Sequence, residues 1–180
     1  MALRHIILLA PSESISSEDV GYISRFVVGA LLLSHGARRD VRLDLVFDGE
    51  KCIGFDGASM KNVRPDEQSL SGILRAGLRR LRDRGEGRIK QGINTKLNPL
   101  EELLEEARGS RLYFGATGGR SSTFESDFTA FFQYPHLDGE VEGELQRKGF
   151  EGMGLGRCPM RPNQAVVMLN NATDRRLAHA

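Results

Sequence analysis

The segment Arg4–Ala10 is the feature that most constrains how this chain can fold. It contains four consecutive apolar residues, Ile6 to Leu9, and a proline follows it at position 11. A strand that is apolar on both sides has to be covered on both faces, as the central strands of parallel sheets are. The segment therefore predicts a buried strand in a sheet that carries helices on each side.

Strand-like and helix-like segments alternate along the rest of the chain. Apolar runs next to turn residues predict strands at 41–47, 52–55, 111–115, 128–132 and 152–155. Apolar residues at helical spacing, or helix-start residues such as proline and glutamate, predict helices over 20–31, 65–81, 98–109 and 139–148. This order predicts an α/β fold with a mainly parallel sheet and helices on both faces. Ligands of such folds usually bind at the carboxyl ends of the strands.

Two segments are harder to interpret from their local sequence. The segment 85–92 is rich in glycine and charge and predicts a mobile loop. The composition of 163–170, with Val-Val-Met-Leu at its centre, predicts a strand.

Length and composition limit the class of protein. A chain of 180 residues suits one domain over 1–180, and no apolar run is long enough to span a membrane. Cys52 and Cys158 have no paired spacing, and the four histidines show no metal-ligand spacing. We therefore expect a cytoplasmic protein that binds no metal.

The segment Leu31-Leu-Leu-Ser-His-Gly-Ala-Arg-Arg-Asp-Val41 joins the first predicted helix to the second predicted strand. Gly36 suits the left-handed conformation that often ends a helix. Arg38 and Arg39 carry planar guanidinium groups that suit phosphate, where a plain turn uses Gly, Asn or Pro. The two arginines indicate either a phosphate contact or a basic helix end that complements the helix dipole.

Charge is unevenly distributed, although the formal net charge is only +1. Acidic residues gather at 101–106 and 138–144. Eight basic residues form a cluster that precedes both acidic runs: Arg75, Arg79, Arg80, Arg82, Arg84, Arg88, Lys90 and Lys96. Such asymmetry can create a face that attracts nucleic acid, and a solvated helix face with salt bridges is the alternative interpretation.

Glycine-rich segments provide two further candidates. Gly115-Ala-Thr-Gly-Gly119 lacks the spacing of a dinucleotide-binding or P-loop motif and is interpreted as a turn. Gly152-Met-Gly-Leu-Gly156 precedes Arg157-Cys-Pro-Met-Arg-Pro162, whose prolines restrict the chain. Alternating glycines let a backbone approach a ligand closely, and constrained loops are often functional.

Taken in order, these segments resemble the archaeal tRNA pseudouridine N1-methyltransferases of the SPOUT superfamily. Leu33-Ser-His-Gly-Ala-Arg-Arg-Asp-Val41 is similar to that family's Leu-Ser-His-x-Ile-Arg-x-Asp-Val, and Pro65-Asp-Glu-Gln-Ser69 to its Pro-Asp-Glu-Arg-Ser. Weaker matches are Gly154-Leu-Gly156 and Asn170-Asn-Ala-Thr-Asp-Arg175. The matches follow the family's order over nearly the whole chain.

The resemblance implies a SPOUT-like α/β fold with a deep C-terminal trefoil knot and a helix over 163–177 in place of the strand. It implies a homodimer that binds S-adenosyl-L-methionine in the knot loops and methylates the T-loop pseudouridine of tRNA. Its implied catalytic residues are Arg39, Asp40 and Glu67, and its implied substrate-binding residues are His35, Arg38 and Asp66. In this assignment the two arginines hold RNA and Asp40 orients them. Its implied cofactor-binding residues are Tyr134, His136, Leu155, Gly156, Arg157 and Ala165.

Some cofactor motifs depart from the family pattern. The family's Leu-Gly-Asp-His, whose glycine leaves room for the cofactor, corresponds to Gln133-Tyr-Pro-His136. Arg157 stands where the family has proline, and Gln68 where it has arginine. A second hypothesis follows from these departures: a SPOUT-fold protein without cofactor that serves in RNA binding or assembly.

Overall fold

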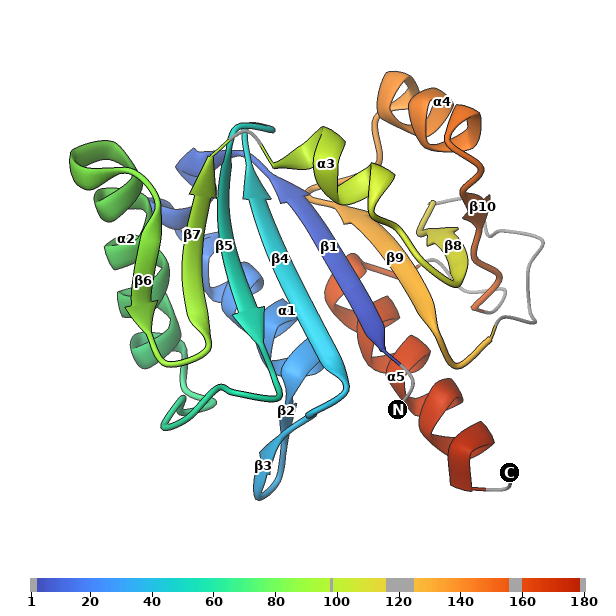
Figure 1. The fold of residues 1–180 in the computed structure, drawn as a ribbon, viewed down its shortest axis with the longest axis horizontal. Coiled ribbons are helices and arrows are strands. Elements are labelled where there is room, and N and C mark those ends of the chain that lie inside the picture. The colour runs from blue at the N-terminus through green and yellow to red at the C-terminus, as the bar shows by residue number, and fades with distance from the viewer. Residues whose placement is uncertain (1–2, 98, 116–124, 156–159, 179–180) are drawn as a thin grey trace.

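The computed structural model describes residues 3–97, 99–115, 125–155 and 160–178 (Figure 1). Its strands are β1 (Arg4–Ala10), β2 (Leu32–Leu33), β3 (Gly36–Ala37), β4 (Val41–Phe47), β5 (Lys51–Asp56), β6 (Gly87–Lys90), β7 (Ile93–Leu97), β8 (Ser110–Tyr113), β9 (Phe128–Gln133) and β10 (Glu151–Gly152). Its helices are the 3₁₀ helix η1 (Ser12–Ile15) and the α-helices α1 (Val20–Leu31), α2 (Glu67–Arg84), α3 (Leu100–Glu105), α4 (Gly139–Arg147) and α5 (Pro162–Ala178).

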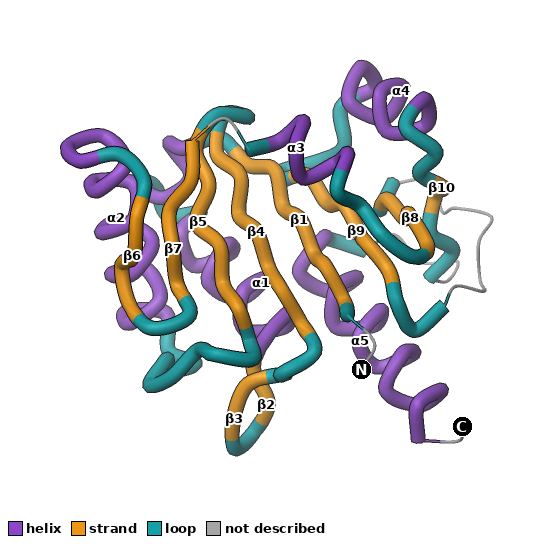
Figure 2. The backbone as a smooth tube through the Cα atoms, viewed as in Figure 1, coloured by secondary structure: helices purple, strands orange, loops and turns teal. Residues whose placement is uncertain are grey.

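Eight strands form one sheet in the order β10-β8-β9-β1-β4-β5-β7-β6, seen face on in Figure 2. The half from β10 to β4 is parallel, and the half from β4 to β6 is antiparallel. β1 lies in the middle of the parallel half, between β9 and β4. The predicted α/β fold with a mainly parallel sheet is confirmed, and an antiparallel extension completes it.

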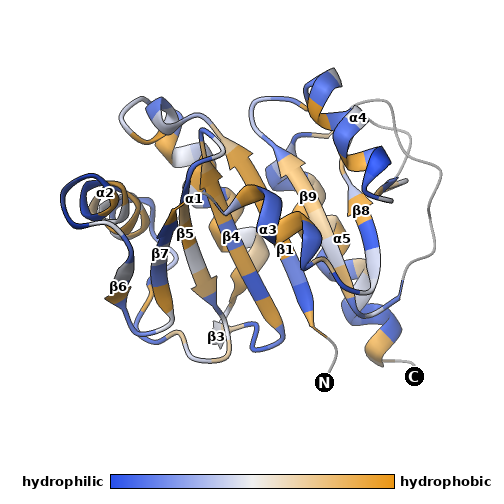
Figure 3. Ribbon diagram, turned by 45° about the horizontal axis from the view of Figure 1, so that its top comes forward, coloured by the Kyte–Doolittle hydropathy of each residue, from blue (hydrophilic) through white to orange (hydrophobic). Residues whose placement is uncertain are grey.

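Helices cover both faces of the sheet, as the apolar β1 segment predicts. Ile6 and Leu8 point into a core beneath α1, α2 and α5, while Ile7 points into a second core beneath α3 and α4. Figure 3 shows the hydrophobic residues concentrated on the central strands, whereas α4 at the edge is mostly hydrophilic. The sheet is therefore the middle layer of three.

Three predictions from local sequence are wrong. Most of the segment 85–92 is not a loop, because β6 lies within it and pairs antiparallel with β7 at the sheet edge. The segment 163–170 lies in α5, since Ala165, Val166 and Leu169 are fully buried in the core at helical spacing, as the resemblance implies. Gly36 ends no helix, because α1 stops at Leu31 and Gly36 pairs with Leu33 in a small hairpin. The predicted knot depends on 116–124 and 156–159, which lie outside the described residues.

Candidate active site

The β2–β3 hairpin presents part of the predicted substrate group to solvent. Leu33 pairs with Gly36, and His35 lies at the exposed tip between the two strands. The hairpin ends where the Arg38 N–H donates to the Leu31 carbonyl at 2.7 Å. Arg39 is exposed. The side chains of His35 and Arg39 are therefore accessible to an RNA.

Arg38 contacts α5, where its Nη1 donates to the two carboxylate oxygens of Asp174 at 2.9 and 2.7 Å. Arg4 opens β1, is 2% exposed, and places its Nη2 2.7 Å from the same carboxylate. Arg4 also donates to Asn170 Oδ1 at 3.1 Å. Its Nε lies 3.0 Å from Asp40 Oδ2 without making a hydrogen bond. Arg4, Arg38, Asp40 and Asp174 form what we call the arginine–aspartate cluster.

Asp174 is the carboxylate that both arginines contact. Burial acts to raise the pKa of Asp174, but hydrogen bonds from Arg4 and Arg38 outweigh it and hold this pKa below its ordinary value. The Asp40 carboxylate faces Arg4, so it supports the base of the cluster, whereas the resemblance assigns it to orienting Arg38 and Arg39. Arg4 and Asp174 were not predicted as site residues. A charged residue at the first position of an apolar strand is the signal that identifies Arg4.

Asp66 and Glu67 lie at the start of α2. Asp66 caps this helix, because its Oδ1 accepts a hydrogen bond from the Ser69 N–H at 2.7 Å. Glu67 is exposed and extends its carboxylate toward α1, where Arg25 Nη1 lies 3.6 Å away. Asp66 thus has a structural contact, while the Glu67 carboxylate remains open to solvent.

Tyr134 and His136 line a surface pocket at the carboxyl ends of β1 and β9. The Tyr134 N–H donates to the Leu9 carbonyl at 2.8 Å, which continues the strand pairing beyond β9. The pocket extends over Asp48 and Gly49, the turn between β4 and β5. This is the edge at which α/β sheets usually bind ligands.

The Tyr134 ring contacts Tyr22 of α1, with ring centroids 4.4 Å apart. Burial of the phenol and the neighbouring Asp19 carboxylate raise the pKa of Tyr134 to about 12. The hydroxyl therefore stays protonated at neutral pH and can donate a hydrogen bond. The ring fills space beside Tyr22 at the position where the family motif has glycine.

The remaining cofactor candidates lie in the segment before α5 and in the first turn of that helix. Leu155 is partly buried against the core. Ala165 is fully buried, so its methyl group packs in the core beneath the start of α5. Asn163 Oδ1 is buried and has no hydrogen-bond partner among the described residues. The Asn163 N–H donates to Tyr22 Oη at 3.1 Å, which ties the start of α5 to the Tyr22–Tyr134 pair. Gly156 and Arg157 lie outside the described residues.

The two predicted groups lie at opposite ends of β1. The Asp40 carbonyl accepts from the N–H of Arg4 at the start of the strand, and Tyr134 donates to Leu9 near its end. Five residue steps of extended strand separate these contacts by about 17 Å. One chain therefore does not bring the predicted hairpin residues, His35 to Asp40, next to the predicted cofactor residues.

The predicted basic cluster separates into different contacts. Lys96 pairs with Glu102, Lys90 donates to the Asn62 carbonyl, and Arg80 donates to the Glu86 carbonyl. Arg75, Arg79 and Arg82 instead line a pocket together with Lys51 of β5. Lys96, Lys90 and Arg80 therefore fit the interpretation of a solvated face, as do the exposed Arg84 and Arg88.

Among the helices that the structure describes, none is both long and apolar enough to cross a membrane. Within the described part of the chain, no three side chains of His, Cys, Asp or Glu are grouped as metal ligands.

Known proteins similar to this chain share its fold and much of its length. The tRNA (pseudouridine(54)-N(1))-methyltransferase of Methanococcoides burtonii is 29% identical over 174 residues, covering 91% of this chain and 86% of its own. The enzyme of the same name from Haloarcula marismortui is 34% identical over 162 residues, covering 84% and 81%. The crystal structure of Archaeoglobus fulgidus Nep1 bound to S-adenosylhomocysteine matches with a TM-score of 0.64 at 17% identity, covering 99% of this chain and 100% of that one.

The likeness to Nep1 establishes the fold alone, because the two sequences have diverged widely. A family model gives the more specific result. The model of the SAM-dependent RNA methyltransferases matches residues 16–178, which include both the hairpin arginines and α5. This chain belongs to the SAM-dependent RNA methyltransferase family.

Proposed function

We propose that this protein transfers a methyl group from S-adenosylmethionine to N1 of a pseudouridine in the T-loop of tRNA. The observation that carries the proposal is the 34% identity, over 84% of the chain, to a tRNA (pseudouridine(54)-N(1))-methyltransferase. A protein that modifies tRNA in this way is expected to work in the cytoplasm.

The described residues fit the adenosine part of the cofactor. Tyr134, Leu155 and Met160 are partly buried hydrophobic residues around the carboxyl end of the parallel strands, and their apolar surface suits a purine ring. The unpartnered Asn163 Oδ1 is a buried acceptor nearby on α5, and it suits an exocyclic amino group. We assign cofactor binding to this region, with His136, Ala165 and the undescribed Gly156 and Arg157 as further members.

Bound S-adenosylmethionine supplies an electrophilic methyl group on a sulfonium sulfur. Pseudouridine N1 is free for attack because this base joins its ribose through carbon. The methyl group would pass to N1, S-adenosylhomocysteine would leave, and a base would have to accept the N1 proton. Such a transfer depends mainly on positioning and on removal of that proton.

The chain offers separate groups for these tasks. Arg39 and His35 are exposed and suit the RNA, and Arg38 is oriented beside them by Asp174. Asp66 caps α2, and Glu67 is the first residue of that helix. The exposed Glu67 carboxylate is our candidate acceptor for the N1 proton, because Asp40 already faces Arg4.

We further propose that the protein acts as a homodimer. The hairpin group and the Tyr134 pocket lie about 17 Å apart in one chain, whereas methyl transfer requires contact distance. A second copy can place its hairpin against this pocket. Val167 and Met168 leave 49% and 48% of their area exposed on α5, and Leu33 leaves 50% exposed on the hairpin, which supports association through this face.

The C-terminal trefoil knot is part of the same proposal. It is supported by the likeness to Nep1 over nearly the whole chain. It is also supported by α5, which is a helix as the resemblance implies.

The test is methylation of a T-arm RNA that carries one pseudouridine. Incubation with methyl-labelled S-adenosylmethionine should label this RNA, and digestion should yield N1-methylpseudouridine by mass spectrometry. The matched control carries uridine at the same position and should stay unlabelled, because its N1 is bonded to ribose. Failure to label either RNA would contradict the proposal.

Calorimetric titration with S-adenosylhomocysteine separates the two hypotheses of function. Binding near 1 μM, about −8 kcal/mol, is expected if Tyr134 leaves room for the cofactor. If no heat and no thermal shift appear at millimolar ligand, the pocket is closed. The result would then support the second hypothesis, an RNA-binding protein without cofactor. The contact between Tyr134 and Tyr22 favours this hypothesis, because the Tyr134 ring fills space where the family motif has glycine.

A further inference from the structure

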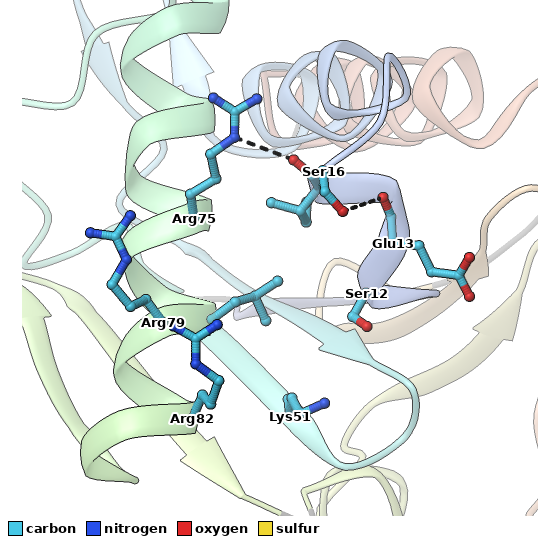
Figure 4. A pocket seen from close by; sticks show the side chains of 9 residues that line it. Ser12, Glu13, Ser16, Lys51, Arg75, Arg79 and Arg82 are labelled. Carbon is cyan, nitrogen blue, oxygen red and sulfur yellow. Dashed lines mark hydrogen bonds between the residues drawn. The ribbon is translucent and has the colours of Figure 1, made fainter.

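A basic pocket lies between η1, α2 and β5, away from the arginine–aspartate cluster. It is a cleft of about 560 Å³ lined by Ser12, Glu13, Ile15, Ser16, Lys51, Arg75, Leu78, Arg79 and Arg82. Figure 4 shows the three arginines projecting from α2 on one side, η1 on the other, and Lys51 on the strand below them. Four cationic side chains thus line one cleft.

Helical geometry aligns the three arginines. Positions 75, 79 and 82 are separated by four and three residues, so they lie on one face of α2. At 1.5 Å per residue, the row extends for about 10 Å along the helix. A row of this length is suited to successive phosphates of a strand, whereas a single phosphate would contact only part of it.

Existing contacts leave much of this charge available. The Nε of Arg75 donates to the Ile15 carbonyl at 3.4 Å. This contact orients the side chain and leaves its two terminal nitrogens available for a ligand. Arg79 makes no hydrogen bond or ion pair within the described residues. Among the residues that the structure describes, Arg82 pairs only with its exposed neighbour Asp83, and Lys51 lies 3.4 Å from Asp48. Exposed pairs of this kind exchange readily for another anion.

One carboxylate, that of Glu13, lies among the lining residues. Figure 4 shows its side chain directed away from the arginines of α2. With Asp48 and Asp83, the partners of Lys51 and Arg82, counted as well, four cations face three carboxylates. The cleft keeps a net positive charge, which attracts phosphate.

The basic pocket adjoins the Tyr134 pocket. Pro11 and Asp48 line the Tyr134 pocket, and their neighbours Ser12 and Lys51 line the basic pocket. The Ser12 N–H donates to Asp48 Oδ1 at 2.9 Å, and this contact forms the boundary between the two pockets. A chain of phosphates in the basic pocket would therefore pass beside the end of the sheet where we place the cofactor.

We propose that the basic pocket binds backbone phosphates of the RNA substrate outside the methylated loop. This inference rests on the proposed function and adds a second contact surface to it. In it, Arg75, Arg79, Arg82 and Lys51 fix the position of the RNA, and the hairpin of the partner copy approaches the base. Phosphate contacts of this kind determine affinity and register without reading sequence.

The test compares two double variants that each remove two positive charges. Arg79→Gln/Arg82→Gln alters the basic pocket. Arg108→Gln/Arg147→Gln alters two exposed arginines next to α3 and in α4, on the other face of the sheet. Filter binding to full-length tRNA should show about tenfold weaker affinity for the first variant, with the salt slope reduced by about 1.5 to 2. The second variant should bind as the unaltered protein does.

Two further measurements separate this inference from the proposed function. S-adenosylhomocysteine affinity should be the same for both variants and the unaltered protein, which shows that the fold is intact. Equal tRNA affinity and salt slope for all three proteins would overturn the basic-pocket inference, even if the unaltered protein methylates tRNA. Failure of the unaltered protein to methylate would contradict the proposed function, while the tRNA-binding comparison would still decide whether this surface binds RNA.

Discussion

Asp44 is a buried acid in the sheet, 3% exposed, and its carboxylate contacts three side chains. Its carboxylate lies 2.7 Å from His5 Nε2 and 2.8 Å from Arg42 Nε, and it accepts a hydrogen bond from Cys52 Sγ at 3.4 Å. Burial acts to raise the pKa of Asp44, but these partners outweigh it and lower this pKa. Burial and the Asp44 carboxylate also raise the pKa of the Cys52 thiol, so Cys52 stays neutral.

The lowered pKa of Asp44 predicts acid sensitivity of the fold. A carboxyl group whose pKa is lower in the folded state stabilises the protein fully above the unfolded value of about 3.9. This contribution is lost as pH falls from there through the folded-state pKa. Urea unfolding from pH 7 to pH 2 should show the free energy of unfolding decreasing below pH 4. The decrease should be shallower in Asp44→Asn, and an unchanged slope would show that other acids dominate.

The arginine–aspartate cluster shows what single-residue reasoning could and could not reach. The arginines at 38 and 39 are recognisable because arginine is an unusual residue for a turn. Their true partners, Arg4 and Asp174, are 34 or more residues away in sequence and meet only when α5 packs beside β1. Spacing along the chain contains no information about such a contact, so the orientation of Arg38 could not be predicted.

At the scale of elements, two substitutions at the start of α2 can show whether Asp66 contacts the substrate or only caps the helix. Asp66→Ala removes the cap and should cost about 1 kcal/mol of stability, measured by urea unfolding. Asp66→Asn keeps a capping oxygen and removes the charge, so it should retain that stability. Methyl transfer that falls in Asp66→Asn would support a substrate role, and unchanged transfer would assign Asp66 to capping alone.

Strands and helices with strong patterns of their own were predictable. The predicted bounds of β1 and β4 match the structure, because each is rich in apolar residues and is followed by residues typical of turns. β6 and α5 depend on neighbours. Ile89 of β6 packs near Gly77 of α2, and Val166 of α5 is fully buried beside Gly29 of α1. Tertiary packing therefore overrides the local composition of both segments.

At the scale of the whole molecule, the separation along β1 is the main constraint on mechanism. α5 runs from Asn163 beside Tyr22 to Asp174 in the arginine–aspartate cluster, so it connects the two ends. Its exposed Val167 and Met168 lie between them. A two-fold dimer through this face makes the same patch meet itself and can form two equal sites.

The dimer proposal predicts that two inactive chains can complement each other. Arg39→Ala alters the hairpin side, and His136→Ala alters the cofactor side, so each variant alone should lose most methyl transfer. Co-expression with two different tags and purification through both tags yields only the mixed dimer. If each site combines the hairpin of one chain with the pocket of the other, one of the two sites contains neither substitution. The mixed dimer should then methylate pseudouridine-containing T-arm RNA at about half the rate of the unaltered dimer. If each site is built from one chain, both sites remain damaged and mixing restores nothing, which would overturn the shared site.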